Sequence, residues 1–131
     1  MAKKQWTPAQ KDAISARGGT VLVSAAAGSG KTAVLIERIM GRILDPEHPI
    51  DADRMLVVTF SNAAAMEMKQ RLMGALDEAM AEDPNSALLQ RQRRLVERAK
   101  ICTIHSFCFD LIRENFHRLG IPPNSRAADE K

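Results

Sequence analysis

The sequence contains no tyrosine, one tryptophan and four phenylalanines, so aromatic residues are only 4% of its 131 residues. Aromatic side chains supply much of the buried area of an ordinary core. A chain with so few gains little from burial, and we expect it to be part of something larger. The chain also lacks an apolar run near the roughly 18–20 residues of a membrane helix. Because Met1–Gln10 is polar, no signal peptide is indicated, and the sequence predicts a cytoplasmic protein without a membrane partner.

Cysteine is nearly absent, since Cys102 and Cys108 are the only two. Two cysteines are too few for a disulfide framework or a cysteine metal cluster. We expect both cysteines to be free thiols in a reducing cytosol. We also expect both to be small residues of the core, because free cysteine is usually buried. The net charge is only +3, from 19 basic and 16 acidic residues, so charge alone does not indicate a nucleic-acid partner.

Segments typical of strands and helices alternate along the chain. Thr7, Pro8 and Gln10 form the cap, first-turn proline and third-position amide that begin a helix. Short, apolar, β-branched segments predict buried parallel strands at residues 20–24, 55–60 and 101–104. Helices are predicted at residues 8–16, 31–44, 62–82, 87–99 and 105–119, the third with apolar residues four apart on one face at Met68, Leu72, Leu76 and Met80. The alternation predicts an α/β fold with a parallel sheet flanked by helices, and three strands would leave a sheet edge open.

Charge is segregated in the middle of the chain. An acidic cluster precedes a basic one; the two comprise Asp77, Glu78, Glu82 and Asp83, and then Arg91, Arg93, Arg94, Arg98 and Lys100. Two interpretations stay open at this point. The basic residues form either a solvated helix face or a patch that contacts a nucleic-acid backbone.

Residues 25–32, Ala-Ala-Ala-Gly-Ser-Gly-Lys-Thr, lie between the first predicted strand and its helix. Gly28 and Gly30 permit backbone conformations closed to other residues, so that successive N–H groups can surround a phosphate at a helix N-terminus. Lys31 would place its ammonium against the β- and γ-phosphates, and Thr32 would offer its hydroxyl to Mg²⁺. The loop predicts binding of ATP with Mg²⁺, with Lys31 and Thr32 as candidate catalytic residues.

The loop departs from the usual pattern at Ala25, where a glycine is more common, and in this form it resembles the phosphate loop of UvrD/Rep-type superfamily 1 DNA helicases. Three stretches resemble further motifs of that family, in the same order. Trp6–Ile14 resembles the Q motif, Val57–Met68 resembles motif Ia, and Thr103–Cys108 resembles the next motif, which meets the DNA strand. Phe116–Asn124 resembles the corresponding stretch of the AddA family of bacterial ATP-dependent helicase/nucleases. The resemblance implies a RecA-like P-loop NTPase fold.

The resemblance also assigns roles to particular residues. The implied nucleotide-binding set is Gln10, Ala25, Ala26, Ala27, Gly28, Ser29, Gly30, Lys31 and Thr32. Gln10 would read the adenine edge, although the same side chain can cap its own helix. The implied DNA-binding set is Thr59, Phe60, Ser61, Asn62, His105, Ser106 and Phe107. A base can stack on Phe60, although Phe60 could pack in the core instead and the neighbouring polar residues could be caps. The phosphate loop, Phe60 and the segment at His105 each follow a predicted parallel strand, so we expect the nucleotide and DNA sites to lie along one sheet edge.

For the whole protein, the resemblance implies an ATP-dependent helicase/nuclease that unwinds DNA and processes double-strand breaks for recombinational repair. Its partners would be single- and double-stranded DNA and a second, AddB-like protein. Alternatives are another UvrD/Rep-type repair helicase, a P-loop small-molecule kinase, or an adaptor that binds a nucleotide only for structure. The family's acidic Walker B pair has no counterpart after a hydrophobic strand, since Asp129-Glu130 lies in the tail. We therefore expect residues 1–131 to be the N-terminal part of the ATP-binding domain, incomplete and inactive alone, with residues 121–131 continuing into a missing domain.

Overall fold

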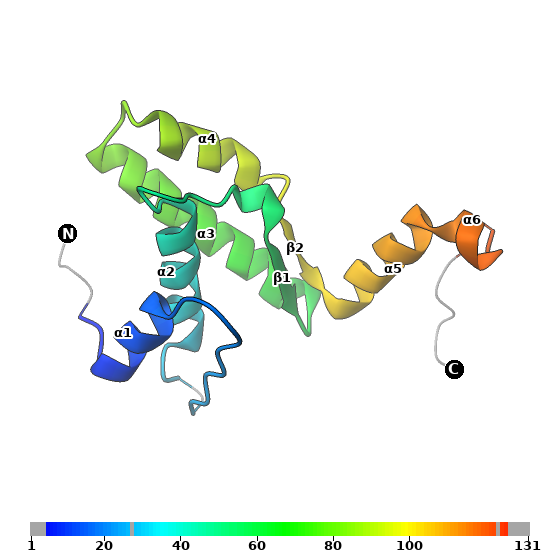
Figure 1. Cartoon of the computed structure of the whole chain (residues 1–131), viewed down its shortest axis with the longest axis horizontal. Coiled ribbons are helices and arrows are strands. Elements are labelled where there is room, and N and C mark those ends of the chain that lie inside the picture. The colour runs from blue at the N-terminus through cyan, green and yellow to red at the C-terminus, as the bar shows by residue number, and fades with distance from the viewer. Residues whose placement is uncertain (1–4, 27, 123, 126–131) are drawn as a thin grey trace.

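The computed structural model describes residues 5–26, 28–122 and 124–125 (Figure 1). Helices predominate over strands, and the two strands form one parallel pair. In chain order the elements are α1 (Pro8–Ser15), α2 (Lys31–Ile43), the 3-10 turn η1 (Ala52–Arg54), β1 (Leu56–Thr59), α3 (Asn62–Glu82), α4 (Ala87–Val96), β2 (Lys100–Thr103), α5 (Ile104–Glu114) and α6 (Phe116–Leu119). A mixed α/β structure with parallel strands is confirmed, with fewer strands than predicted.

Polar caps explain where most of the helices begin. The Thr7 hydroxyl accepts a hydrogen bond from the Gln10 backbone N–H at 3.3 Å, and Gln10 Oε1 accepts one from the Thr7 N–H at 2.9 Å, which completes a capping box. Ser61, Ser86 and Thr103 cap α3, α4 and α5 in the same way. These side chains satisfy backbone donors that the first helical turn leaves without partners.

The core lies between α2, α3 and α4. Its buried residues are Ile36, Ile39, Ile43, Ala52, Met68, Leu72, Leu76, Leu89 and Val96. Met68, Leu72 and Leu76 are spaced by four residues, so they lie on one face of α3, as their sequence pattern predicts. Gln92 on α4 is polar and fully buried, and its Oε1 accepts a hydrogen bond from the Ala52 N–H at 3.0 Å. This contact ties α4 to the turn that leads into β1.

The two strands run side by side with their carboxyl ends level, because Thr59 is the register partner of Thr103. Val57 packs against the core, whereas Leu56 and Val58 are 48% and 45% exposed. The strand predicted here is therefore right in position and wrong in burial. A parallel strand is buried when layers cover both of its faces, and Leu56 and Val58 instead line an open cavity.

Residues 20–24 do not form the buried strand predicted for them. They have no regular secondary structure, and Leu22 is 92% exposed. An apolar run becomes a buried strand where neighbouring strands take up its hydrogen bonds, and the sheet of the described structure consists of β1 and β2 alone. Val21 and Val23 instead line a cavity of about 270 Å³ beside α2.

The last helices also differ from prediction. The single helix predicted at 105–119 is two, because Asn115 interrupts it and its side-chain amide donates to the Leu111 carbonyl at 2.8 Å. Gly120 ends α6 at a φ of +63°, the left-handed conformation typical of a helix end. The helix predicted to reach residue 99 ends earlier, at Val96.

Both cysteines are free. Cys102 in β2 is half-buried, but Cys108 on α5 is exposed, so its predicted core position is wrong. The reason is that α5 extends away from α1, α2, α3 and α4 (Figure 1) and, as described, has no fully buried residue. Within the described ranges no helix is both long and apolar enough to cross a membrane. Asp129-Glu130 and most of the predicted tail lie outside the described residues.

Candidate functional site

The predicted phosphate loop leads directly into α2. Gly28 and Gly30 have φ of +78° and +85°, so both take up the left-handed conformation that favours glycine. Gly30 is the N-cap of α2, and no side chain caps this end of the helix in the described structure. The backbone N–H groups in the first turn of α2 therefore have no side-chain acceptor, and they lie at the positive end of the helix dipole, where an anion can bind. Ala27, also predicted for this site, lies outside the described residues.

The Lys31 side chain folds back over this loop. Its Nζ donates to the carbonyl oxygens of Ala25 at 2.6 Å and Ala26 at 2.7 Å. Such short contacts are typical of charge-assisted hydrogen bonds. Thr32 follows in the first turn of α2, with its side chain exposed. The arrangement places an ammonium group and a hydroxyl beside the uncapped end of one helix.

Gln10 joins α1 to the loop. Its Nε2 donates to the Ser29 carbonyl at 3.2 Å, while its Oε1 accepts from Thr7 in the capping box. A cavity of about 310 Å³ lies here, lined by Thr7, Ala9, Gln10, Ala13, Val23, Ser24, Ala25, Ser29, Lys31 and Val34. Gln10 therefore caps its own helix, the role that the sequence offered as an alternative to adenine recognition. Both the oxygen and the nitrogen of its amide make a hydrogen bond. Within the described residues each end is engaged once only, so one N–H and one lone pair of the amide remain for a ligand edge.

A second group of predicted residues lies where β1 ends. The Thr59 hydroxyl donates to the Ser61 carbonyl at 2.9 Å, and the Ser61 hydroxyl accepts from the Ala64 N–H at 3.1 Å. Phe60 is 97% exposed, so the alternative weighed for it, packing in the core, is not observed within this chain. Asn62 is the first residue of α3 and is also exposed.

The segment after β2 lies beside this group because the two strands end together. The Thr103 hydroxyl donates to Ser106 Oγ at 2.9 Å and accepts from the Ser106 N–H at 3.1 Å. His105 and Ser106 are exposed, and Phe107 is half-buried. Thr103 caps α5 and thereby positions His105, Ser106 and Phe107. It was not predicted as a site residue, although a threonine three residues before Ser106 is a recognisable helix-capping pattern.

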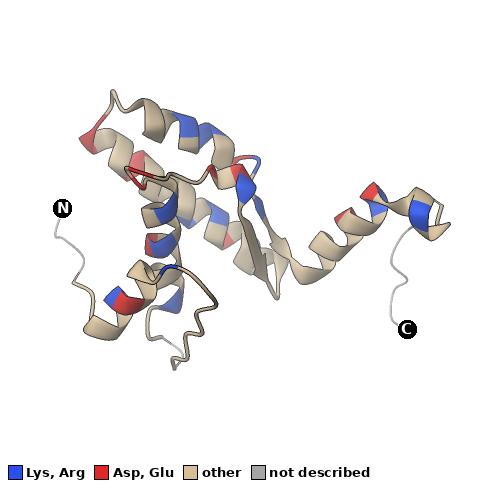
Figure 2. Ribbon diagram, viewed as in Figure 1, with Lys and Arg blue, Asp and Glu red and all other residues tan. Residues whose placement is uncertain are grey.

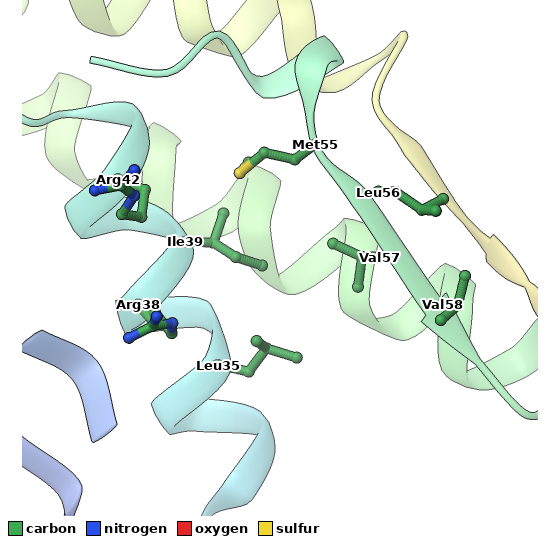
Figure 3. A pocket seen from close by; sticks show the side chains of 8 residues that line it. All are labelled: Leu35, Arg38, Ile39, Arg42, Met55, Leu56, Val57 and Val58. Atoms are coloured by element: carbon green, nitrogen blue, oxygen red, sulfur yellow. The ribbon is translucent and has the colours of Figure 1, made fainter. Parts of the chain in front are cut away.

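The sequence predicted that the phosphate loop and these two segments share one sheet edge, and this prediction is wrong for the described structure. Because residues 20–24 are not a strand, the loop lies at the N-terminal end of α2, apart from the carboxyl ends of β1 and β2 (Figure 1). A cavity of about 430 Å³, larger than the one beside Gln10, lies between α2 and β1 (Figure 3), lined by Leu35, Arg38, Ile39, Arg42, Met55, Leu56, Val57 and Val58. None of the predicted site residues that the structure describes lines it.

Three of the five basic residues in the middle of the chain form ion pairs within the protein; Figure 2 colours Lys and Arg blue and Asp and Glu red. Arg91 pairs with Asp51 at 2.7 Å, Arg93 with Asp77 at 2.7 Å, and Lys100 with Asp110 at 3.1 Å. The Arg91 hydrogen bond lowers the pKa of Asp51, and the Asp110 hydrogen bond raises the pKa of Lys100. These pairs favour a solvated, ion-paired helix face over a patch reserved for nucleic acid.

Comparison with known proteins supports the resemblance found in the sequence. Residues 6–131 match the UvrD/REP helicase N-terminal domain. The chain is 58% identical over 125 residues to the A subunit of an ATP-dependent helicase/nuclease from Pelotomaculum thermopropionicum, covering 95% of this chain and 10% of that protein. It is 56% identical over 128 residues to the protein of the same name from Anoxybacillus flavithermus, covering 98% of this chain and 11% of that protein. The chain thus spans about a tenth of the length of these relatives.

Proposed function

Because the chain belongs to the UvrD/REP helicase N-terminal domain family, we propose that it is the ATP-binding portion of an ATP-dependent DNA helicase/nuclease of the AddA type. In this proposal residues 1–131 are the N-terminal part of a RecA-like P-loop domain. The whole protein unwinds DNA and processes double-strand breaks together with a second, AddB-like protein. The names of its relatives, which are A subunits of ATP-dependent helicase/nucleases, support this assignment.

The observation that carries the proposal is the loop at residues 25–32. Its two glycines in the left-handed conformation open onto the uncapped N-terminus of α2, and the Lys31 ammonium lies over the loop carbonyls. Backbone N–H groups, a helix dipole and a compact cation are the donors that a polyphosphate requires. The residues present therefore fit a nucleotide phosphate chain.

Each residue has a defined task in this proposal. Lys31 leaves the carbonyls of Ala25 and Ala26 and donates to the β- and γ-phosphates, exchanging neutral acceptors for charged ones. Thr32 offers its hydroxyl to Mg²⁺, which keeps most of its waters. Gln10 offers the second N–H and the second lone pair of its amide to the adenine edge. Bound ATP supplies the free energy of hydrolysis, and we expect this chain alone to hydrolyse it negligibly.

DNA is the proposed partner of the second group. Phe60 presents an aromatic face that packing within the chain does not use, and a base of any sequence can stack on such a face. His105 and Ser106 are exposed beside it, since β1 and β2 end together. Hydroxyl, amide and imidazole groups at Thr59, Ser61, Asn62 and His105 provide donors for the DNA backbone.

The test is ATP hydrolysis by the complete protein, measured with and without single-stranded DNA. We expect hydrolysis that DNA stimulates and that Lys31→Ala abolishes. A small-molecule kinase would consume ATP only by transferring phosphate to an acceptor, without a response to DNA, and a structural adaptor would bind nucleotide without turnover. Either result would refute the proposal.

A further inference from the structure

Helix α1 carries Gln10 but has little hydrophobic attachment to the rest of the protein. In the described structure none of its residues, Pro8–Ser15, is fully buried. It packs against α2, and polar contacts hold it at both ends. At its N-terminal end Gln10 donates to the Ser29 carbonyl at 3.2 Å. The position of α1 therefore depends on what holds its other end.

Arg38, on α2, holds that other end. Its Nη1 donates to the carbonyl oxygens of Ala13 at 2.7 Å and Ala16 at 2.8 Å. Carbonyl groups in the last turn of a helix lack partners within the helix, and they form its negative end. A guanidinium group supplies both the donors and the opposite charge. The Arg38 side chain is half-buried, so solvent screens these bonds less than it would on an open surface.

Arg17 also contacts carbonyls at this end of α1, and it shares Ala16 with Arg38, but it cannot serve the same purpose. Its Nη1 donates to Ile14, Ser15 and Ala16 at 2.9–3.1 Å. Arg17 follows α1 directly in the chain, so it caps the helix from its own segment. In the described structure Arg38 is the side chain that links the end of α1 to α2 by hydrogen bonds.

We infer that Arg38 is a positioning residue for the nucleotide base. This inference rests on the proposed function, in which Gln10 reads the adenine edge and the loop holds the phosphates. Arg38 lies about two turns along α2 from Lys31. It fixes α1 to the same helix that begins at the phosphate loop, so that base and phosphate contacts keep a constant separation. Its own hydrogen bonds go to the end of α1, away from Gln10.

The test compares two ligands that differ in whether they contact the base part of the proposed site. Mg-ADP would contact both α1 and the loop, whereas inorganic tripolyphosphate would contact the loop alone. Isothermal titration of the 131-residue chain is expected to show Mg-ADP binding about tenfold weaker in Arg38→Met than in wild type, with tripolyphosphate binding unchanged. Arg38→Lys keeps a cationic donor and should restore part of the lost ADP affinity.

Arg42→Met is the matched control, because Arg42 lies one turn further along the same helix (Figure 3) and has no hydrogen bond to α1 in the described structure. It should leave both affinities unchanged. The protein's single tryptophan, Trp6, lies two residues before α1, so its emission should shift in Arg38→Met and not in Arg42→Met.

The outcomes separate the inference from the proposed function. Equal loss of ADP and tripolyphosphate affinity, or no loss of either together with unchanged Trp6 emission, would overturn the positioning role of Arg38. The same holds if Arg42→Met has the same effect as Arg38→Met. A wild-type chain that binds neither ligand would refute the proposed function, and the inference with it.

Discussion

Replacing Phe60 with alanine separates a DNA-binding role from a structural one. The ring is 97% exposed, so Phe60→Ala removes almost no packing from this chain. A buried phenylalanine would cost about 3–5 kcal/mol in stability on the same change. Stacking of a base on an aromatic ring contributes about 1–3 kcal/mol, which is about a 5- to 150-fold change in affinity. We therefore expect single-stranded DNA to bind the complete protein more weakly by that factor, while the melting temperature of the 131-residue chain stays the same.

The assay is fluorescence anisotropy with labelled oligonucleotides, performed on the complete protein because this chain spans about a tenth of its relatives' length. Oligonucleotides of different sequence should lose similar affinity, since stacking tolerates any base. Leu22→Ala is the matched control, because Leu22 is a large apolar residue, 92% exposed, and not at the sheet edge. Unchanged DNA affinity in Phe60→Ala, or equal losses in both variants, would refute the reasoning.

Three further predictions follow from other contacts. Gln92→Leu should lower the free energy of unfolding by about 1–3 kcal/mol in denaturant titrations, because it leaves the buried Ala52 N–H without its acceptor; an unchanged midpoint would contradict this. Arg91 lowers the pKa of Asp51, so their pair stabilises the fold above the unfolded pKa of about 3.9 and loses this effect as pH falls through the lower folded value. The difference in denaturation midpoint between wild type and Arg91→Met should therefore shrink as the pH falls below the unfolded pKa, and a constant difference would argue against the pair. Cys108 is exposed and should react with a thiol reagent in the native protein before the other cysteine does.

Local signals in the sequence predicted local structure well. The capping box of Thr7 and Gln10 and the four-residue spacing in α3 are both present, because each depends on residues within one or two helical turns. The left-handed glycines of the loop, Gly28 and Gly30, were also predicted, since such a backbone is open to few other residues. The residues of the loop could thus be found without the fold.

Burial and position in the sheet were predicted less well, because they depend on distant segments. Residues 20–24 have the composition of a buried strand, but the described sheet offers them no neighbour. Without that strand, the predicted common edge for the loop and Phe60 is not formed. Arg38 gave no sequence signal, since its contacts with α1 join residues more than twenty positions apart.

The most direct test of the account is the affinity of this chain for Mg-ADP with and without the Lys31 ammonium. Hydrogen bonds to charged groups contribute about 1.5–3 kcal/mol, so calorimetry should show binding at least about tenfold weaker in Lys31→Ala than in wild type. Lys11→Ala removes the same charge from neighbouring α1 and should bind Mg-ADP as wild type does. If Lys31→Ala keeps the affinity of wild type, or if both variants lose it equally, residues 25–32 are not a phosphate-binding loop.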